Sequence, residues 1–162
     1  MQTFLHEGSD FDLGARILDR QRLLKQVVEG YQILNCLAGT KTGWQNHPAV
    51  KMWAGSEGWL YLYITAHINE VERRGFKNTT RPLIDQLMNL YFLDWQEDVP
   101  PPWLYDDRVK ITHRGRLYEK NPVHYAMYRP ESEIFKKFVC CDRCSYFWPT
   151  HTIDYQLELV NG

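Results

Sequence analysis

The stretch LGARILDRQRLLKQVVEGYQILNCL, residues 13–37, carries an apolar side chain at nearly every third or fourth position. The apolar set is Ile17, Leu23, Leu24, Val27, Val28, Tyr31 and Leu34. Because an α-helix has about 3.6 residues per turn, this spacing gathers them on one side of a helix. Gly39 and Gly43, which follow, are typical of a helix end and a loop. The stretch therefore predicts one long amphipathic helix over residues 13–37.

The same pattern predicts two further helices. One begins at Pro48, a residue favoured in the first turn of a helix, and runs to about Arg74. The other spans about residues 81–95, with a proline in its first turn and a stripe of leucine and isoleucine.

The remainder of the chain has a different texture. Residues 99–162 combine prolines with scattered aromatics, which predicts short helical turns, irregular segments and a small strand near residues 135–140. We therefore expect a mainly α, compact single domain over residues 1–162. About three main helices form a core within residues 1–98, and an irregular, aromatic-rich C-terminal extension wraps on it.

The composition excludes several classes of protein. The chain has 162 residues, and 19 Lys and Arg stand against 20 Asp and Glu, a net charge of -1 that argues against indiscriminate nucleic-acid binding. No run reaches the roughly 18 apolar residues of a membrane helix. The first ten residues lack the basic-then-apolar order of a signal peptide. We therefore expect a cytoplasmic protein with no membrane contact.

The charges are unevenly distributed along the chain. Residues 14–25 hold four basic side chains against one acidic side chain, and residues 101–128 hold five against three. Residues 82–100 hold four acidic side chains and no basic one. Such basic segments could form a docking face for phosphates, but a solvated surface is the more usual role of charge clusters.

Cys141 and Cys144 form the one C-x-x-C pattern in the sequence, and His151 lies seven residues further on. A tetrahedral zinc takes four ligands, which these three residues and either Cys36 or Cys140 could supply. The sequence has no second C-x-x-C. Because the protein is expected in the cytoplasm, we favour reduced structural thiols, and we predict no metal and no cofactor.

Arg22, Gln26 and Glu29 recur at spacings that place them on one helix face, with Lys25 beside them. A glutamate among basic side chains on a polar face is more often part of a solvated set of salt bridges than a catalytic group. Spacing alone therefore favours the structural interpretation of Glu29.

Longer runs of residues resemble a known family. LDRQRLLKQVVE, residues 18–29, resembles the first helix of the phage pyrimidine-dimer DNA glycosylases, the UV endonucleases, in which a Gln and a Leu precede the catalytic Glu at matching spacing. NHPAV at 46–50 and RRGF at 73–76 resemble their second helix and its end. The start MQTFL and the run HPAVKMW resemble a bacterial and phage branch of this family still more. That branch also carries a later segment matched here by Thr112, His113, Arg114, Leu117, Lys120, Pro122 and Tyr125.

The resemblance implies a mechanism. In the UV endonucleases the free N-terminal α-amine attacks the sugar C1′ of the damaged nucleotide, expels the base and leaves a Schiff base. A carboxylate on the first helix assists proton transfer and β-elimination of the strand. An α-amine has a reference pKa of about 8, so part of it is neutral and nucleophilic at neutral pH. Carried over by position, Glu29 is the acid/base and the chain terminus is the nucleophile.

The terminus departs from the family pattern. In characterised members a Thr directly follows Met1, whereas Gln2 here precedes Thr3. Gln is too large for usual methionine removal, so Met1 and Thr3 join Glu29 as candidate catalytic residues. A monofunctional glycosylase, in which Glu29 activates water, is an alternative. So are a DNA-binding or protein-interaction module without catalysis and an enzyme that handles free modified nucleotides.

The resemblance and the basic segments together indicate side chains for DNA contact. The candidates are Arg16, Arg20, Gln21, Arg22, Lys25, Gln26, His47, His113, Arg114 and Lys120. His47 could equally cap the helix that starts at Pro48, and Trp44 in a polar loop could stack on a base. His113 and Arg114 are expected in a basic loop, residues 112–116. The expected partner is duplex DNA with a damaged or modified pyrimidine, bound by a monomer in a bacterial or phage-infected cell.

Overall fold

The computed structural model describes residues 1–151, and every regular element in that part of the chain is a helix. The prediction of a mainly α protein is confirmed. The chain divides into two compact units, one of residues 1–4 and 10–101, and one of residues 5–9 and the chain from 102 onward. The single-domain organisation stays a prediction. None of the described helices is long and apolar enough to cross a membrane.

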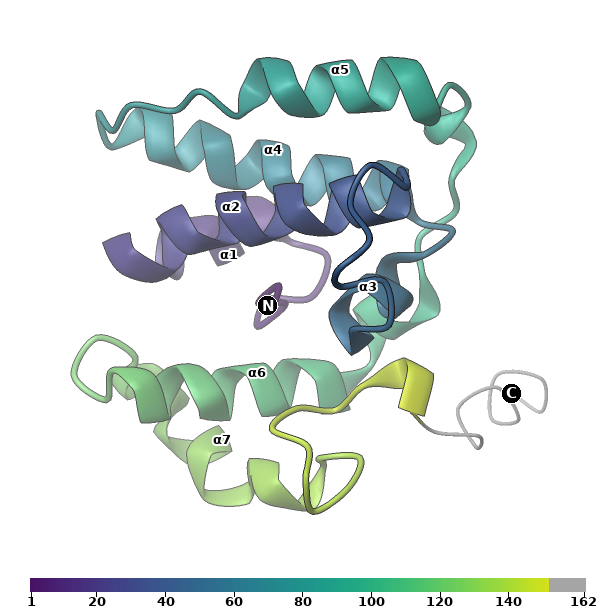
Figure 1. Cartoon of the computed structure of the whole chain (residues 1–162). Helices are drawn as coiled ribbons and strands as arrows, with labels where there is room; N and C mark the ends of the chain where they lie inside the picture. The colour runs from purple at the N-terminus through teal and green to yellow at the C-terminus, as the bar shows by residue number, and fades with distance from the viewer. Residues whose placement is uncertain (152–162) are drawn as a thin grey trace. The chain divides into compact units, whose positions relative to one another are not determined.

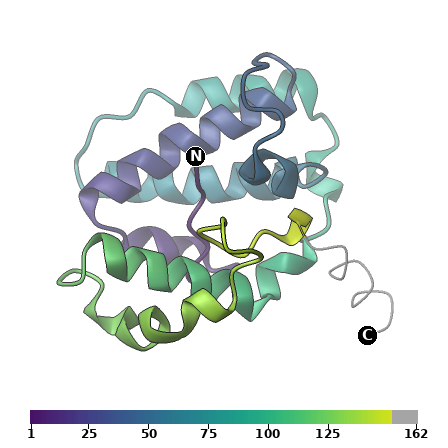
Figure 2. The same ribbon diagram turned by 60° about the horizontal axis from the view of Figure 1, so that its bottom comes forward.

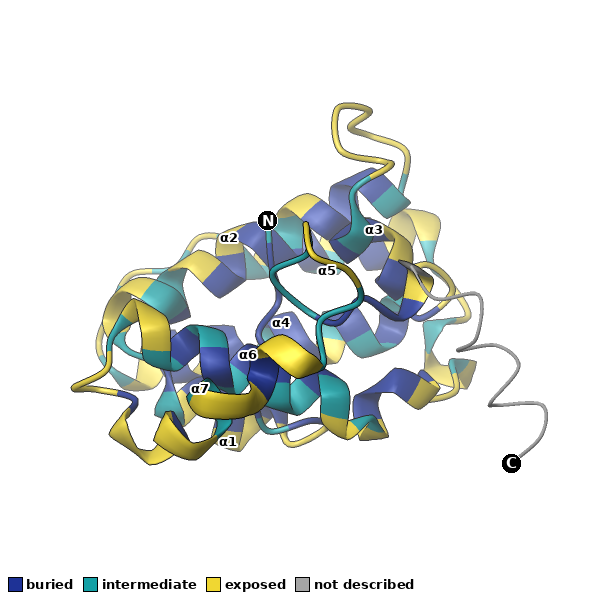
Figure 3. Cartoon of the chain, turned by 90° about the horizontal axis from the view of Figure 1, so that it is seen from below, coloured by how far each residue is buried: buried dark blue, intermediate teal, exposed yellow. Residues whose placement is uncertain are grey.

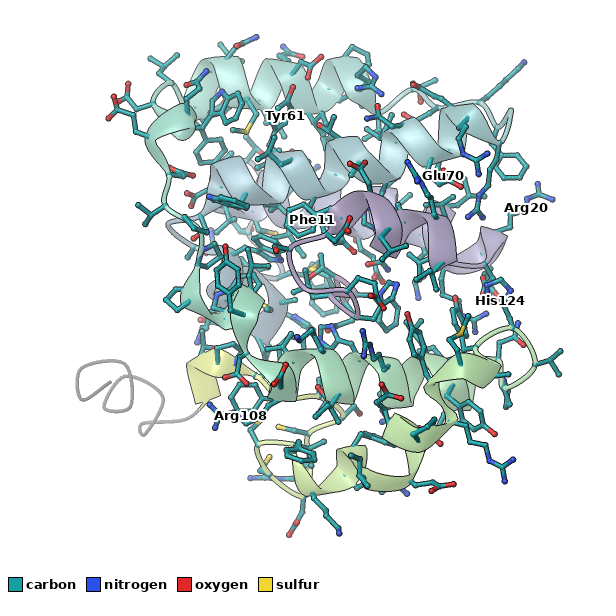
Figure 4. The ribbon with its side chains drawn as sticks, turned by 180° about the vertical axis from the view of Figure 1, so that it is seen from behind. Phe11, Arg20, Tyr61, Glu70, Arg108 and His124 are labelled. Carbon is teal, nitrogen blue, oxygen red and sulfur yellow. The ribbon has the colours of Figure 1, made fainter. Side chains whose placement is uncertain are left out.

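The first unit is built around α4. Its helices are α1 (Phe11–Ile17), α2 (Arg20–Leu37), α3 (Pro48–Trp53), α4 (Glu57–Arg73), α5 (Arg81–Tyr91) and the short 3₁₀ helix η1 (Trp95–Glu97). Helix α4 packs on α1, α2 and α5, and Figure 1 shows α2, α4 and α5 side by side. The largest fully buried side chains here include Trp53 and Tyr63. The ring of Phe11, labelled in Figure 4, lies edge-on to that of Tyr63, with ring centroids 5.3 Å apart.

The helix predicted over residues 13–37 is two helices, so that prediction is wrong in its boundaries. Leu18 is extended and fully buried between α1 and α2. Asp19 then caps α2, because its side chain accepts a hydrogen bond of 2.9 Å from the Arg22 backbone N–H. A short acidic side chain before a helix competes with continuous helix formation and favours a new start.

The other two predicted helices are also shorter. Gly55, with φ of +80°, separates α3 from α4, because this left-handed conformation favours glycine and ends a helix. Helix α5 ends at Tyr91, and the chain turns through η1 towards Asp98. The Asp98 carboxylate accepts a 2.7 Å hydrogen bond from the backbone N–H of Gly58 in the first turn of α4. The break between α3 and α4 depends on the backbone angle of one residue, Gly55, which apolar spacing does not reveal.

Helices α2 and α4 approach each other closely at Gly30. A Cβ atom at this position would lie 2.6 Å from Cγ1 of Ile64, so only glycine fits without a shift. Gly30 directly follows Glu29, so this close packing fixes the position of Glu29 along α2 relative to α4.

The end of α4 is tied to the end of α1 by Arg74. Its guanidinium donates to the carbonyl oxygens of Leu18 and Arg16 at 2.9 Å each. The Glu70 carboxylate holds this guanidinium and that of Arg73 (Figure 4 labels Glu70). Hydrogen bonds from Arg73 and then Arg74 lower the pKa of Glu70 to about 2. The carboxylate therefore stays charged and orients Arg74 at ordinary pH.

The second unit contains α6 and α7 with short turns. Its elements are η2 (Pro102–Tyr105), α6 (Asp107–Lys120), η3 (Ala126–Tyr128), α7 (Arg129–Ile134), η4 (Phe135–Lys137) and η5 (Pro149–His151). Figure 2 shows α6 and α7 with the following loop beside them. Two predictions are wrong here. The expected loop at residues 112–116 is the middle of α6, and the expected strand at 135–140 begins as η4. Gly115 explains the tight packing, since a Cβ there would lie 2.3 Å from the Phe135 ring.

Candidate active site at the amino terminus

Residues 2–4 are buried, and Met1 before them is partly exposed. Gln2, Thr3 and Phe4 are 7%, 0% and 5% exposed. Their backbone follows α2: the Gln2 N–H donates to Glu29 Oε2 at 3.0 Å, and the Phe4 N–H donates to Gln26 Oε1 at 2.8 Å. Figure 2 shows the marked N-terminus beside α2. Terminal residues are usually poorly ordered unless they are tied down, so this burial is a specific feature of the molecule.

Two aromatic side chains hold the same segment from α3 and α4. The Trp53 indole N–H donates to Thr3 Oγ1 at 3.0 Å. The Tyr63 hydroxyl lies 2.6 Å from Gln26 Oε1 and 3.2 Å from the Phe4 carbonyl oxygen, and it can donate to either. Burial raises the pKa of Tyr63 well above its ordinary value, so the hydroxyl stays protonated and remains a donor. Three helices thus fix the backbone of residues 1–4.

This arrangement places the α-amine beside a carboxylate. The Met1 nitrogen lies 3.8 Å from Glu29 Oε1, and the Lys25 Nζ lies 3.5 Å from the same oxygen. Glu29 is only 7% exposed, whereas the Lys25 side chain is largely exposed. The carboxylate therefore faces two cations and also accepts the Gln2 N–H, so its negative charge is well compensated. An amine and a carboxylate at this separation can exchange protons through a modest movement or through one water.

His47 belongs to the same environment. Its Nδ1 accepts a 3.1 Å hydrogen bond from the Ala49 N–H and so caps α3, which is the structural role weighed for it from the sequence. Burial, and then the positive charge of the Met1 ammonium, lower the pKa of His47, while the Glu29 carboxylate opposes that shift. The lowered pKa leaves the His47 ring largely uncharged at neutral pH.

An exposed loop precedes His47. Residues 39–46 are all exposed, and Figure 3 shows this loop projecting beside α3. Trp44 is 57% exposed, and its ring lies edge-on to His47 with centroids 5.7 Å apart. A large aromatic surface is therefore open to solvent beside the group of Met1, Glu29 and His47.

A family model described as pyrimidine dimer DNA glycosylase matches residues 1–83. The chain belongs to this family. Comparisons with curated proteins and with solved structures give no match. The glycosylase family model covers the buried terminus, all of α1 to α4 and the start of α5, and therefore the whole group around Glu29. The resemblance noted at residues 112–125 lies outside the matched range.

The glycosylase candidates for DNA contact occupy three kinds of position in the first unit. Arg16, Arg20, Gln21 and Lys25 are exposed on α1 and α2. Arg22 is half-buried and bonds Asp19 at 3.0 Å. Gln26 is fully buried, and the structure gives it the positioning role described above, which is a correction to its expected contact with DNA.

The glycosylase candidates in the second unit differ as well. The His113 ring is fully buried, accepts the Leu5 N–H at Nδ1 at 2.8 Å, and has its pKa lowered by burial to about 3. Arg114 bonds the His6 carbonyl oxygen, Glu7 and Glu131. These two residues therefore hold segment 5–9 on α6, and burial removes His113 from direct contact with a phosphate. Lys120 is exposed at the end of α6.

Trp53 and Tyr63 are the site residues that the sequence did not identify, because their spacing marked them only as core. Among the described residues, no group of three His, Cys, Asp or Glu side chains is placed to hold a metal. Cys141 and Cys144 are neighbours, but the side chain of the third zinc candidate, His151, lies outside the described residues. Cys36 is buried in the first unit.

Proposed function

We propose that this protein is a DNA glycosylase with lyase activity, acting on a damaged pyrimidine in duplex DNA, in which the Met1 α-amine is the nucleophile and Glu29 the acid/base. The observation that carries the proposal is the buried terminus, which holds the Met1 nitrogen 3.8 Å from Glu29 Oε1. The family is one of DNA glycosylases for pyrimidine dimers, which supports the substrate class.

The chemical steps follow from these two groups. The neutral amine forms a bond to C1′ of the damaged nucleotide as the bond between C1′ and the base breaks, and the base leaves with a proton. Opening of the sugar ring gives a Schiff base between Met1 and C1′. Glu29 then removes a proton from C2′, and the 3′ phosphate leaves. A positioned general base of this kind typically contributes about 10²–10⁴ in rate.

The residue after Met1 supports this assignment despite its departure from the family pattern. Gln2 is buried, and its backbone nitrogen is itself 3.0 Å from Glu29 Oε2. With Met1 retained, the Met1 amine is adjacent to the carboxylate. Loss of Met1 would turn the Gln2 nitrogen into an amine at the same carboxylate. Intact-mass measurement establishes which terminus a given preparation carries.

The exposed basic residues support DNA as the substrate. Arg16, Arg20 and Lys25 lie on α1 and α2, the helices that lead to Glu29, and they can neutralise phosphates on either side of a lesion. Extracting a nucleotide from the stack costs a few kcal/mol, and a damaged base lowers that cost. With a net charge of only -1, non-specific affinity is expected to be weak and to fall quickly with salt.

The test is borohydride trapping on duplex DNA that carries either a UV photoproduct or an abasic site. We expect a covalent adduct that peptide mapping places on the terminal residue. A variant with Gly-Ser added before Met1 should lose the adduct, while the same dipeptide added after Gly162 serves as the matched control. Base release without an adduct would replace the amine route by water activated at Glu29. Specific DNA binding without base release would establish the binding module instead.

A further inference from the structure

Three thiols gather in the loop that follows η4 in the second unit. The Sγ atoms of Cys141 and Cys144 lie 2.9 Å apart. A turn closed by the Cys144 N–H on the Cys141 carbonyl oxygen, at 2.9 Å, brings the two side chains together. The Cys140 Sγ lies 3.4 Å from the Tyr146 carbonyl oxygen and also forms a hydrogen bond with Cys144. Cys144 therefore lies between two neighbouring thiols.

The loop is anchored on one side of this turn. The Arg116 Nε donates to the Ser145 carbonyl oxygen at 3.1 Å, and the Phe147 N–H donates to Thr112 Oγ1 at 3.2 Å. Cys144, next to these anchors, is half-buried, whereas Cys141 is exposed. The two sulfur atoms thus differ in access to solvent while they remain in contact.

The pKa values of the two thiols also differ, and the more exposed thiol, Cys141, has the lower one. A hydrogen bond from Cys144, then the backbone N–H of Arg143, lowers the pKa of Cys141. Burial, followed by hydrogen bonds with Cys141 and Cys140, raises the pKa of Cys144 to about 12. An exposed thiol with a lowered pKa beside a protonated partner is the arrangement in which one sulfur attacks an oxidant and the other resolves the product.

We propose that Cys141 and Cys144 form a redox-active dithiol that is oxidised reversibly to a disulfide by small peroxides. The Cys141 thiolate attacks one peroxide oxygen: an S–O bond forms, the O–O bond breaks, and the leaving hydroxide takes a proton to become water. Cys144 then attacks the Cys141 sulfur: the S–S bond forms, the S–O bond breaks, and a second water leaves. Two thiols lose two electrons in total, and one hydrogen peroxide is reduced to two waters.

The geometry requires little movement for this reaction. A disulfide has an S–S distance of about 2.05 Å, so the sulfur atoms must approach by less than about 1 Å. A surface hollow of about 290 Å³ lies against Cys144 and is lined also by Arg116, Phe135, Lys136 and Asp142. Cys141 is not among the residues that line this hollow, but its side chain is exposed, so a small peroxide reaches its sulfur directly from solvent.

The test uses the full-length reduced protein, desalted and treated with one equivalent of hydrogen peroxide. We expect two thiols per chain to be lost and to return with dithiothreitol. Trypsin cuts after Arg143 and so separates Cys141 from Cys144, and mass spectrometry should therefore find the two peptides joined. Random loss across all four cysteines, or no joined peptide, would overturn the proposal.

Variants assign the two sulfurs. C144S should retain a sulfenic acid on Cys141 that dimedone traps, and C141S should slow thiol loss by at least about tenfold. C140S and C36S, the controls, should still form the disulfide, and C141S, C144S and C140S should keep the parental circular dichroism and melting temperature. Stoichiometric zinc in the purified protein that is lost in C141S would assign the cluster to a metal and overturn the redox role.

Discussion

The Gln26 carboxamide is one side chain of α2 that binds the amino-terminal segment, and the Glu29 carboxylate is another. Replacing Gln26 with leucine tests whether it positions the proposed nucleophile. Gln26 Oε1 accepts the Phe4 N–H at 2.8 Å and lies 2.6 Å from the Tyr63 hydroxyl. Leucine has a similar volume and removes both acceptor contacts. The hydroxyl of Tyr63 retains the Phe4 carbonyl oxygen, 3.2 Å away, as an acceptor. The Phe4 N–H is the group left without its partner.

The magnitudes separate stability from activity. An unsatisfied buried N–H costs about 1–3 kcal/mol. Gln26 Nε2 is buried with no hydrogen-bond partner among the described residues, so removing it should stabilise the protein by an amount similar to the cost of the unsatisfied Phe4 N–H. We therefore expect Q26L to lose less than about 1 kcal/mol of unfolding free energy. A shift of about 1 Å in a reacting group can reduce the rate about 100-fold, equivalent to about 2.7 kcal/mol in the transition state.

The assay measures Schiff-base trapping under single-turnover conditions on duplex DNA with an abasic site. Q26L should trap about 100-fold more slowly, with DNA affinity unchanged because the residue is buried. Y63F is the matched control: it removes the second donor but keeps the bond from Phe4 to Gln26, so its rate should fall less than about tenfold. Raising the pH should not restore Q26L, because the defect is one of position and not of amine protonation.

Two results would refute this reasoning. Q26L with the parental trapping rate would show that Gln26 does not position the terminus. A loss of rate accompanied by an equal loss of DNA affinity would instead support the contact with DNA that the sequence predicted.

Four further predictions concern other parts of the first unit. E29Q should lower base release by about 10²–10⁴ while the Kd for damaged duplex stays within a factor of a few, and equal losses in both would argue against an acid/base role. Gly30→Ala should cost about 1–3 kcal/mol by urea unfolding, because its Cβ meets Ile64 at 2.6 Å. I64A alone should cost about 2–5 kcal/mol because Ile64 is fully buried, and the double variant should lose less than the sum of the two single losses, since the added methyl group then has room. The pKa of Glu70 is about 2 in the folded protein against 4.5 ordinarily. Its contribution to the free energy of unfolding is therefore complete above pH 4.5 and is lost as the pH falls towards 2. In E70Q, the decrease in unfolding free energy between pH 4.5 and pH 2 should be smaller by about 1–2 kcal/mol. Trp44→Ala should weaken binding to damaged duplex by about 1–3 kcal/mol if the ring stacks on a base, with no change in melting temperature, since the side chain is 57% exposed.

The positions of the helices could be predicted from apolar spacing, but their ends could not. Asp19 interrupts the first predicted helix because its side chain caps α2 through one hydrogen bond. Gly55 interrupts the second because of its positive backbone angle φ. The predicted apolar stripe was also too wide. Val28 belongs to it by spacing but is 52% exposed, whereas Gln26 lies in the buried face between Leu23 and Gly30. A polar residue in the centre of a buried helix face was the available signal that Gln26 has an internal partner.

The catalytic candidate Glu29 could be proposed from sequence only through a family resemblance, because spacing alone favoured a solvated ion pair. The groups that complete its surroundings lie far apart in the chain: Thr3 bonds Trp53, and Phe4 lies beside Tyr63. A local pattern cannot reveal contacts between residues separated by about 50–60 positions, since each partner satisfies the pattern of an ordinary core residue.

Residues 2–4 are buried, and they hold the Met1 amine that we propose as the nucleophile. Ordering four backbone residues costs about 1–2 kcal/mol each. The hydrogen bonds to Glu29, Gln26, Trp53 and Tyr63 return about 0.5–1.5 kcal/mol each, and burial of Phe4 adds about 2 kcal/mol. These opposing terms are of similar size, so the segment is held with little surplus. Any change that weakens one anchor, or any extension before Met1, is therefore expected to displace the amine well before it unfolds the helices.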